Sequence, residues 1–460
     1  MSIEARSQKA LRMLVDVKPG EIRALFGSFA YFFFLLASYY VLRPLRDEMA
    51  IAGGVDRLPW LFTATLGVML LAVPAWSWLV ARLAIGRLIP IVYRFFLAQL
   101  ILFFFVFHGP GPHPIAARVF FVWTSVFNLF VVSIFWGFMA DRFHEEQGKR
   151  LFGFISAGGS AGAILGPALT SVAVTRVGPV NLILIAAFLL EAAAQLASQV
   201  ASWRWRPVGQ RATDSKAEAT ANTEASAPAP PTPERRKSLR EASTPAALLE
   251  STGIGGGTWS AILLLLRSPY LLAIAGYVLF LTSTGTLGYM LQSRMIAAAA
   301  MTPTTRTALF ARIDFWVNIG AAITQSLIAG RFLLRFGVGP ALALPPVLTI
   351  VSALALGASP TLAILFVGQA IRRVVEYALG RPAREVLYTV VTREEKYKPK
   401  TFIDTVVYRG GDAASGWAFA ALAGQGASLP LLAMAVIPLA LVWMGLSVWL
   451  ARRHEQRLRA

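Results

Sequence analysis

Long apolar segments alternate with short polar segments along most of the chain. Each apolar segment is close to the ~20 residues that an α-helix needs to cross the hydrocarbon core of a bilayer. Six are expected near Ile22–Leu42, Leu58–Val80, Leu88–His108, Arg118–Ala140, Leu151–Thr175 and Pro179–Ala201, and six more near Pro269–Leu291, Leu309–Leu334, Pro340–Ala358, Thr361–Val391, Thr401–Gly424 and Leu429–Ala451. The pattern therefore predicts an all-α membrane protein with twelve transmembrane helices.

A segment of different composition separates the two sets of helices. From about Trp203 to Gly257 the chain is small, polar and proline-bearing, so it cannot support a packed core. We predict a disordered cytoplasmic linker there. The expected organisation is a cytoplasmic N-terminal segment at 1–20, a six-helix bundle at 21–202, the linker at 203–257, a second six-helix bundle at 258–451 and a cytoplasmic tail at 452–460.

The composition agrees with a membrane protein. The 460 residues are 56% hydrophobic and 15% charged, whereas about a quarter of the residues are charged in a typical soluble protein. The net charge of +19 is better explained by Lys and Arg in alternate loops, facing an anionic leaflet, than by nucleic-acid binding. We therefore expect both termini in the cytoplasm and membrane lipids, with no nucleic acid, among the partners.

Several kinds of chemistry find no support in the sequence. The chain has no cysteine, which excludes disulfides, thiolate metal sites and a cysteine nucleophile. The four histidines lie in predicted loops or the tail, without the spacing of metal ligands. No nucleophile elbow or phosphate-binding P-loop is present. We expect neither an enzyme nor a bound metal or cofactor.

Short similar sequences occur at matching places in the two sets of helices. YVLRPLR ends the first span and YMLQSRM ends the seventh, and two pairs of charged loops follow corresponding spans at nearly the same separation. The aligned positions are Arg43 with Gln292, Glu146 with Glu395, and Arg82 with Arg335. These similarities predict two pseudo-symmetric six-helix bundles around a central path, as in many transporters.

Charged residues are concentrated in the stretch from Ile371 to Trp417 and at the end of the first span. Ionisable groups at membrane depth cost several kcal/mol unless they face a partner or a water-filled cavity. Arginines at that depth favour an anionic or phosphorylated small-molecule substrate. The candidate substrate-binding residues are Arg43, Arg46, Asp47, Arg384, Glu385, Arg409, Tyr39 and Tyr289.

Carboxylates in the same spans are candidates for proton coupling, since burial raises the pKa of a carboxyl group toward neutrality. These candidates are Asp404, Asp412 and Asp314. Structural roles are alternatives for other groups. Asp47 and Glu376 are equally consistent with ion pairs that hold the halves together, and aromatic side chains in spans usually serve packing.

Two motifs resemble those of the major facilitator superfamily. GRFLLRFG, at Gly330–Gly337, resembles its loop signature, with Leu334 where an acidic residue usually stands. GAILGP, at Gly162–Pro167, resembles a glycine–proline motif of some antiporters in that superfamily. Close helix packing through small residues is the favoured interpretation of the second motif.

More extensive similarity points to a particular family of transporters. Four segments resemble the ATP/ADP translocase family of obligate intracellular bacteria and plastids, together with its free-living bacterial relatives. They are LRPLRDEM (Leu42–Met49), FWGFMADRF (Phe135–Phe143), LFARIDFWVN (Leu309–Asn318) and RPAREVLYT…EEKYKPKTFIDTVVYRGGD. The resemblance implies a twelve-helix, major facilitator-like secondary transporter in the bacterial inner membrane, and we expect it to be a monomer.

The sequence departs from that family at positions that matter for the substrate. Arg46 stands where the nucleotide exchangers have a phosphate-contacting lysine, and Asp412 stands where they have another lysine. Their seventh-helix glutamate has no acidic counterpart here, while Asp141 stands at the polar position of the fourth helix and joins the coupling candidates. The resemblance thus implies transport but not ATP/ADP exchange in particular.

Two functions follow from the sequence. The first is a secondary active transporter that moves an anionic or phosphorylated small molecule by alternating access, with nucleotide exchange as one form of it. The alternative is a proton-coupled exporter of a lipid, a drug or a secreted metabolite on the same fold, with Asp404 or Asp412 titrating.

Overall fold

The computed structural model describes residues 17–18, 21–82, 85–203, 258–392 and 399–459. The predicted linker, apart from Trp203, and most of the predicted N-terminal segment lie outside these residues. The first half of the molecule consists of α2 (Ile22–Ala52), the 3₁₀ turn η1 (Val55–Arg57), α3 (Leu58–Arg82), α4 (Ile85–Phe107), α5 (Pro114–Arg142), α6 (Glu145–Val177) and α7 (Leu182–Ser202).

Short π-helical segments interrupt several helices of the second half. Its elements are α11 (Thr258–Arg267), α12 (Pro269–Ala298), α13 (Pro303–Thr324), the π-helix η2 (Gln325–Ala329), α14 (Gly330–Phe336), α15 (Val338–Ala358), α16 (Leu362–Val375), the π-helix η3 (Glu376–Gly380), α17 (Arg381–Leu387), the 3₁₀ turn η4 (Tyr388–Val390), the π-helix η5 (Ile403–Val407), α19 (Tyr408–Gly424), α20 (Leu429–Met434) and α21 (Val436–Arg459).

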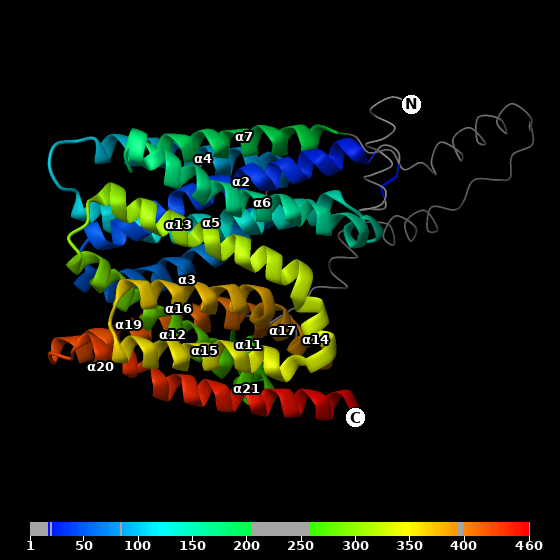
Figure 1. Cartoon of the computed structure of the whole chain (residues 1–460). Helices are drawn as coiled ribbons and strands as arrows, with labels where there is room; N and C mark the ends of the chain where they lie inside the picture. Colours follow the sequence, from blue (N-terminus) through cyan, green and yellow to red (C-terminus); the bar gives the residue numbers. More distant parts are fainter. Residues whose placement is uncertain (1–16, 19–20, 83–84, 204–257, 393–398, 460) are drawn as a thin grey trace, which may run out of the picture.

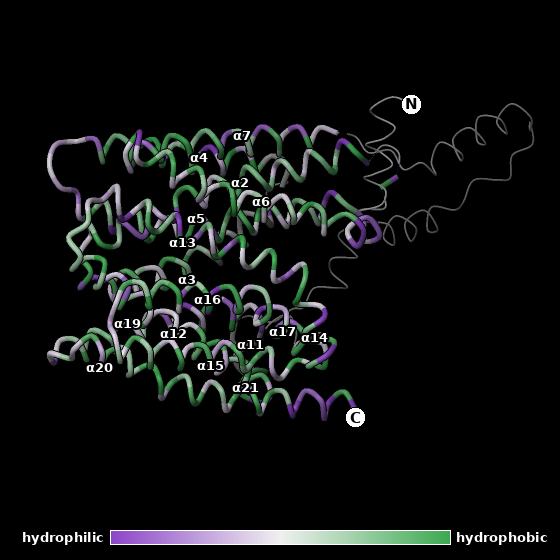
Figure 2. Tube along the Cα trace, viewed as in Figure 1, coloured by the Kyte–Doolittle hydropathy of each residue, from purple (hydrophilic) through white to green (hydrophobic). Residues whose placement is uncertain are grey.

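Every predicted span coincides with a helical segment, and the all-α membrane fold is confirmed. Among the described residues, ten helices are long and apolar enough to cross a membrane. The predicted tenth and eleventh spans fall outside that set because their charged and small polar residues make them less apolar. Figure 2 shows hydrophobic residues along most of the bundle and hydrophilic residues at the C-terminal end of α21.

Two helices extend beyond the predicted spans. The first span was expected to end at Leu42, but α2 continues to Ala52 with Pro44 inside it. A proline in a helix removes one backbone hydrogen bond, and buried neighbours on both sides keep this helix continuous. Arg43 therefore lies well inside α2. The last helix likewise continues past the predicted end of the second bundle and reaches Arg459.

The helices of the two halves have corresponding neighbours. In the first half α2 packs on α6 and α7, and in the second half α12 packs on α19 and α21; likewise α4 packs on α7 and α15 packs on α21. Two equivalent contacts join the halves: α13 packs on α6, and α3 packs on α19. Figure 1 shows the halves one above the other, with α13 and α3 between them. This equivalence is what a duplicated six-helix unit produces.

Two ends of the bundle can be distinguished. Ile22 and Arg459 lie at the same end, which we name the terminal end (Figure 1). The connections from α2 to α3, around Gly53, and from α12 to α13, around Met301, lie at the other end, which we name the opposite end. This distinction locates the contacts that hold the halves together.

Glycines of α6 allow it to approach α2 closely. A Cβ atom on Gly162 would collide with the backbone carbonyl oxygen of Phe33 and lie 2.9 Å from the backbone nitrogen of Ala37. At Gly166 a Cβ would lie 2.9 Å from the carbonyl oxygen of Ala37. The GAILGP motif thus serves close helix packing, which fixes α2 and the charged residues that it carries.

Alanine at Gly162 should destabilise the protein, because the new methyl group meets backbone atoms that cannot rotate away. We expect a loss of about 1–3 kcal/mol and a lower thermal midpoint in detergent. Gly153→Ala in the same helix is the control, since nothing lies within 4 Å of its Cβ position; it should be neutral or stabilising by up to about 1 kcal/mol. Equal midpoints for the two variants would contradict the packing argument.

Candidate functional site

A buried carboxylate lies between arginines from the two halves. Asp314 of α13 accepts a hydrogen bond from Nη2 of Arg373 in α16 at 2.6 Å, and its other oxygen lies 3.4 Å from Nε of Arg43 in α2. The Asp314 side chain is 3% exposed. Arg43 and Asp314 were predicted site residues, whereas Arg373 was recognised only as part of the charged stretch. The cluster leaves one positive charge in excess.

A second ion pair lies three residues further along α2. Arg46 Nη2 is 2.7 Å from Oδ1 of Asp47, and the hydroxyl of Tyr289 in α12 donates to the same oxygen at 3.1 Å. The Arg46 guanidinium also lies over the ring of Phe121, 5.1 Å from its centroid. The structure therefore brings three predicted residues together across the halves.

A third carboxylate is held within the second half. Asp412 accepts hydrogen bonds from the hydroxyls of Thr282 at 2.6 Å and Thr286 at 2.7 Å. Its other oxygen accepts from Nη1 of Arg409 at 3.1 Å. Both carboxylate oxygens of Asp412 are thus paired within the second half.

The π-helix η3 adds buried groups that the predicted site lacked. Glu376 is 6% exposed, and its Oε2 has no hydrogen-bond partner among the described residues. Tyr377 lies under the guanidinium of Arg381, 4.5 Å from the ring centroid. π-helical turns inside helices are frequent at functional sites. Sequence periodicity does not reveal them, because they change the register by one residue.

Other predicted residues lie apart from these clusters. Glu385 is exposed and pairs with Lys400 at 2.5 Å, and Asp404 is exposed in η5. Asp141 is exposed near the terminal end of α5 and forms no ion pair with any described residue.

Two further predicted residues are at least partly buried. Tyr39 is buried with its ring against Tyr40. Arg384 is half-buried in α17, and its Nε has no hydrogen-bond partner among the described residues.

Positive charge exceeds negative charge in this region. Glu48 and Glu385 pair with Arg306 and Lys400; without them, the arginines from Arg43 onward in α2 and in the segments from α16 to α19 outnumber the carboxylates of the same region. The described groups are Arg43, Arg46, Arg372, Arg373, Arg381, Arg384 and Arg409, against Asp47, Asp314, Glu376, Asp404 and Asp412. An excess of arginine in a largely buried region favours binding of an anion.

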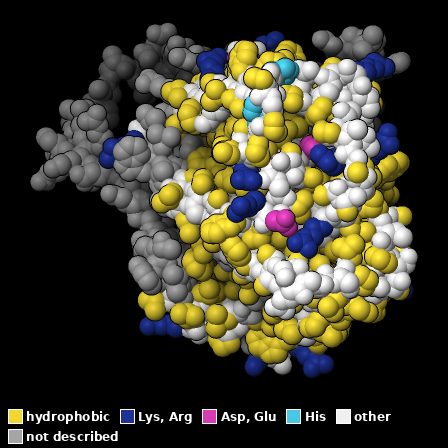
Figure 3. Space-filling model, turned by 90° about the vertical axis from the view of Figure 1, so that its left-hand side faces the viewer, with side chains coloured by type: hydrophobic (Ala, Val, Ile, Leu, Met, Phe, Trp, Pro, Cys, Tyr) yellow, Lys and Arg dark blue, Asp and Glu magenta, His cyan; other side chains and the backbone are white. Residues whose placement is uncertain are grey.

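Ion pairs join the halves at the opposite end. Arg306, at the start of α13, donates from Nε and Nη2 to the two carboxylate oxygens of Glu48 at 2.6 Å each. Arg294 of α12 pairs with Asp56 of η1 at 3.2 Å. Figure 3 shows this end, with a few charged side chains amid a mostly apolar and uncharged surface.

Uncharged groups reinforce that contact. The indole nitrogen of Trp417 in α19 donates to the hydroxyl of Thr63 in α3 at 3.1 Å, and its ring meets that of Trp60 edge to face. Deeper in the bundle, the amide of Asn318 donates to the carbonyl oxygen of Ala163 at 2.8 Å. The opposite end is therefore closed by direct contacts between the halves.

At the terminal end, a buried carboxylate forms contacts inside the first half alone. Glu21, just before α2, accepts hydrogen bonds from Gln147 at 2.9 Å and from Arg150 at 3.1 Å. Burial opposes the charged form, but hydrogen bonds from Gln147, Arg150 and the backbone nitrogen of Lys18, together with the charge of Arg150, outweigh it and hold the pKa of the Glu21 carboxyl below its ordinary value. This contact fixes the start of α2 against α6 without reaching the second half.

Comparison with known proteins finds similarity in sequence over part of the chain. No protein-family model matches the chain. Over 204 residues the chain is 24% identical to ADP,ATP carrier protein 1 of Chlamydia muridarum (strain MoPn / Nigg), and this match covers 39% of the chain and 39% of that carrier. The matched region is thus about two-fifths of the length of the relative.

Solved structures show the same fold at low sequence identity. A bacterial homologue of the human lysosomal transporter Spinster, in an inward-facing and unoccupied conformation, has a TM-score of 0.54 and 13% identity over 96% of this chain and 98% of its own. The nucleoside transporter NupG has a TM-score of 0.52 and 13% identity over 96% and 100%. A POT family transporter in complex with 5-aminolevulinic acid has a TM-score of 0.60 and 11% identity over 94% and 96%.

These similarities show the fold. The chain has the same fold as the solved transporters named above, and part of it is similar in sequence to an ADP,ATP carrier protein. Both findings agree with the resemblance found in the sequence.

The Asp314 cluster should show strong energetic coupling. We expect Asp314→Asn to lower the free energy of unfolding by about 3–5 kcal/mol, because it leaves two buried arginines without their shared carboxylate. Adding Arg373→Gln should cost less than the sum of the two single changes. Thermal unfolding of both single variants and the double variant checks this.

Glu385→Gln is the control for this cycle, since its partner Lys400 is in an exposed pair worth at most about 1 kcal/mol. Strictly additive losses for Asp314 and Arg373 would show that the pair is not coupled.

Proposed function

We propose that the protein is a secondary active transporter that moves an anionic or phosphorylated small molecule between its two halves by alternating access. The observation that carries this proposal is the shared carboxylate of Asp314, held between Arg43 of the first half and Arg373 of the second. An anionic substrate could bind to both arginines of this cluster. In the empty protein, the Asp314 carboxylate occupies the place of that anion.

The contacts of Arg43 favour exchange of partners. Its guanidinium lies 3.4 Å from Asp314 and 5.6 Å from the centroid of the Tyr40 ring, and it donates no hydrogen bond to another described residue. A planar guanidinium with free donors suits the paired oxygens of phosphate or carboxylate. An incoming anion would compete with Asp314 for Arg43 and Arg373, so that substrate binding changes the contacts between the halves.

Aromatic side chains near the arginines support a substrate with an aromatic ring. Tyr289 contacts Asp47, Phe121 lies under Arg46, and Tyr377 lies under Arg381. Together with the similarity to an ADP,ATP carrier, this arrangement makes nucleotides one specific member of the proposed substrate class. Arg46 takes the place that the sequence resemblance gives to a phosphate-contacting lysine.

The distribution of contacts supports a state that is open toward the terminal end. Glu48 and Arg306 join the halves at the opposite end, while Arg381, Glu385 and Asp404, toward the terminal end, are exposed. We infer that the terminal end faces the cytoplasm of a bacterial inner membrane, in agreement with the positively charged loops of the sequence.

One observation favours the alternative of proton-coupled export. Glu376 is buried with one carboxylate oxygen lacking a hydrogen-bond partner among the described residues. Of the predicted coupling residues, Asp314 and Asp412 both pair with arginines. Glu376 is therefore a stronger candidate for a titrating group than either of them.

Loss of the Arg46 charge should abolish transport. We expect Arg46→Ala to eliminate saturable uptake in proteoliposomes, Arg46→Lys to retain part of it, and Arg452→Gln, an exposed change on α21, to have no effect. Substrates are chosen first by a thermal-shift screen of nucleotides, phosphorylated sugars, lipids and organic acids, because ligands stabilise the folded state that binds them.

Unchanged flux in Arg46→Ala would remove this residue from the site. The driving force separates the two functions. Uptake that depends on substrate inside the vesicles supports exchange, whereas uptake driven by an imposed pH gradient alone supports proton coupling.

Opening of the opposite end can be tested with a single cysteine, since the chain has none of its own. In a Tyr289→Cys background, Arg306→Gln should increase labelling by an impermeant thiol reagent from the opposite end several-fold, because Glu48 loses both of its hydrogen bonds. The exchanged pair Glu48→Arg with Arg306→Glu should restore protection. Equal labelling in all three proteins would show that this ion pair does not close the path.

A further inference from the structure

A cavity of about 60 Å³ lies inside the second half, apart from the cluster that joins the halves. It is lined by residues of α12, α15, α16, α20 and α21. Since a water molecule needs roughly 10–15 Å³ of such volume, the cavity has room for a few waters or one monatomic ion with water.

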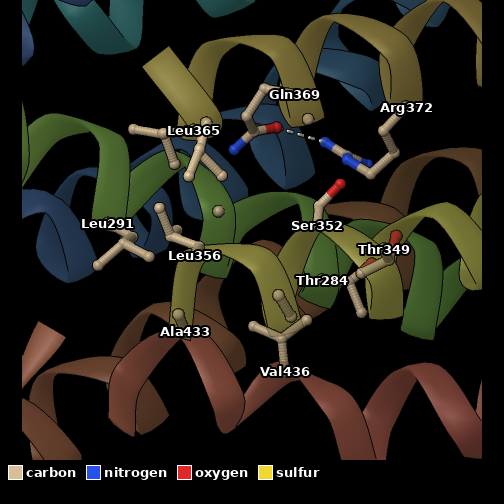
Figure 4. Close-up of a pocket in the computed structure, with 14 residues that line it drawn as sticks. Thr284, Leu291, Thr349, Ser352, Leu356, Leu365, Gln369, Arg372, Ala433 and Val436 are labelled. Atoms are coloured by element: carbon tan, nitrogen blue, oxygen red, sulfur yellow. Dashed lines mark hydrogen bonds between the residues drawn. The ribbon is translucent and has the colours of Figure 1, made fainter. Parts of the chain in front are cut away.

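Arg372 lies at the edge of this cavity. Its Nη2 donates to Oε1 of Gln369 at 3.1 Å (Figure 4), and no described carboxylate forms an ion pair with it. The next residue, Arg373, pairs with Asp314. Adjacent residues of an α-helix point about 100° apart, so Arg373 reaches the interface between the halves while Arg372 reaches into the second half.

Glycines of α12 make room for these two side chains. A Cβ atom on Gly285 would lie 3.7 Å from Nη2 of Arg372, and a Cβ on Gly288 would collide with the amide of Gln369. The side-chain oxygen of Ser352, from α15, points toward Arg372 in Figure 4. The rest of the cavity wall is mainly apolar and includes the side chains of Leu291, Leu356, Leu365 and Val436.

The other hydroxyls of the cavity are already used as donors. Thr284 donates to the carbonyl oxygen of Phe280 at 2.9 Å, and Thr349 donates to that of Pro345 at 2.9 Å. Within the described part of the chain, the donors that remain are the other N–H groups of the Arg372 guanidinium, the amide nitrogen of Gln369 and the hydroxyl of Ser352. The site offers donors and a positive charge, and no carboxylate lines it.

We propose that this cavity binds a small monovalent inorganic anion of about the size of chloride, held by Arg372 with Ser352 and Gln369 as further donors. A largely buried arginine without a carboxylate partner costs free energy, and a bound anion offsets that cost. Glu376, four residues along from Arg372, lies within electrostatic range of it and disfavours anions of higher charge, so we expect a monovalent anion. The proposal does not depend on the identity of the transported substrate.

The test is the thermal stability of the purified full chain as chloride replaces gluconate at constant ionic strength. We expect the midpoint of unfolding to rise with chloride and then saturate, and bromide to act in the same way. In Arg372→Gln the half-saturating concentration should rise at least roughly tenfold, or about 1.4 kcal/mol. Arg372→Lys should retain a weaker response, because it keeps the charge and loses the planar fork.

A second variant keeps the proposal testable if Arg372→Gln does not fold. Ser352→Leu leaves the arginine in place and fills the cavity, so it should also remove the response. Arg452→Gln should respond as the unaltered protein does.

Arg43→Gln separates this site from the one between the halves and should keep the full response. A response lost in Arg43→Gln but kept in Arg372→Gln would place the anion between the halves and overturn the proposal. The absence of any chloride response in the unaltered protein would overturn it as well.

Discussion

The cost of burying charge between the two halves is the constraint on which the architecture depends. Asp314 is almost fully enclosed, and its partners come from α2 in one half and α16 in the other. Separating the halves would take Arg43 away from Asp314, while Arg373 stays paired with Asp314 inside the second half. A buried ion left unpaired costs several kcal/mol, so a path between the halves opens readily only if something else satisfies Arg43. An anionic substrate does this directly, which links binding to movement without any covalent step.

Close packing of uncharged residues fixes the positions of the charged residues around Asp314. The glycines of α6 allow close contact with α2, so that Arg43 and Arg46 are held at a fixed distance from α12 and α13. The continuation of α2 through Pro44 matters for the same reason. If the helix ended at Leu42, the charged residues that follow would belong to a loop. Precise ion pairs depend here on apolar close packing.

The sequence was sufficient to predict the helices and the charged region, but not the pairing of individual side chains. Length and hydropathy determine a transmembrane span, so each predicted span corresponds to a helix. The partner of Asp314 depends on rotation about the helix axis, which separates Arg373 from Arg372. The π-helix η3 shifts the register further, which helps to explain why Glu385 is exposed while Glu376 is buried.

The two adjacent arginines of α16 have different parts in the proposed mechanism. Arg373 contacts a group whose other partner belongs to the first half, so its environment must change when the halves move. Arg372 contacts only its own half, and its neighbours Gln369 and Gly285 move with it. An anion beside Arg372 would therefore stay bound throughout the transport cycle. It would keep the end of α16 neutral enough that Arg373 remains free to exchange Asp314 for substrate.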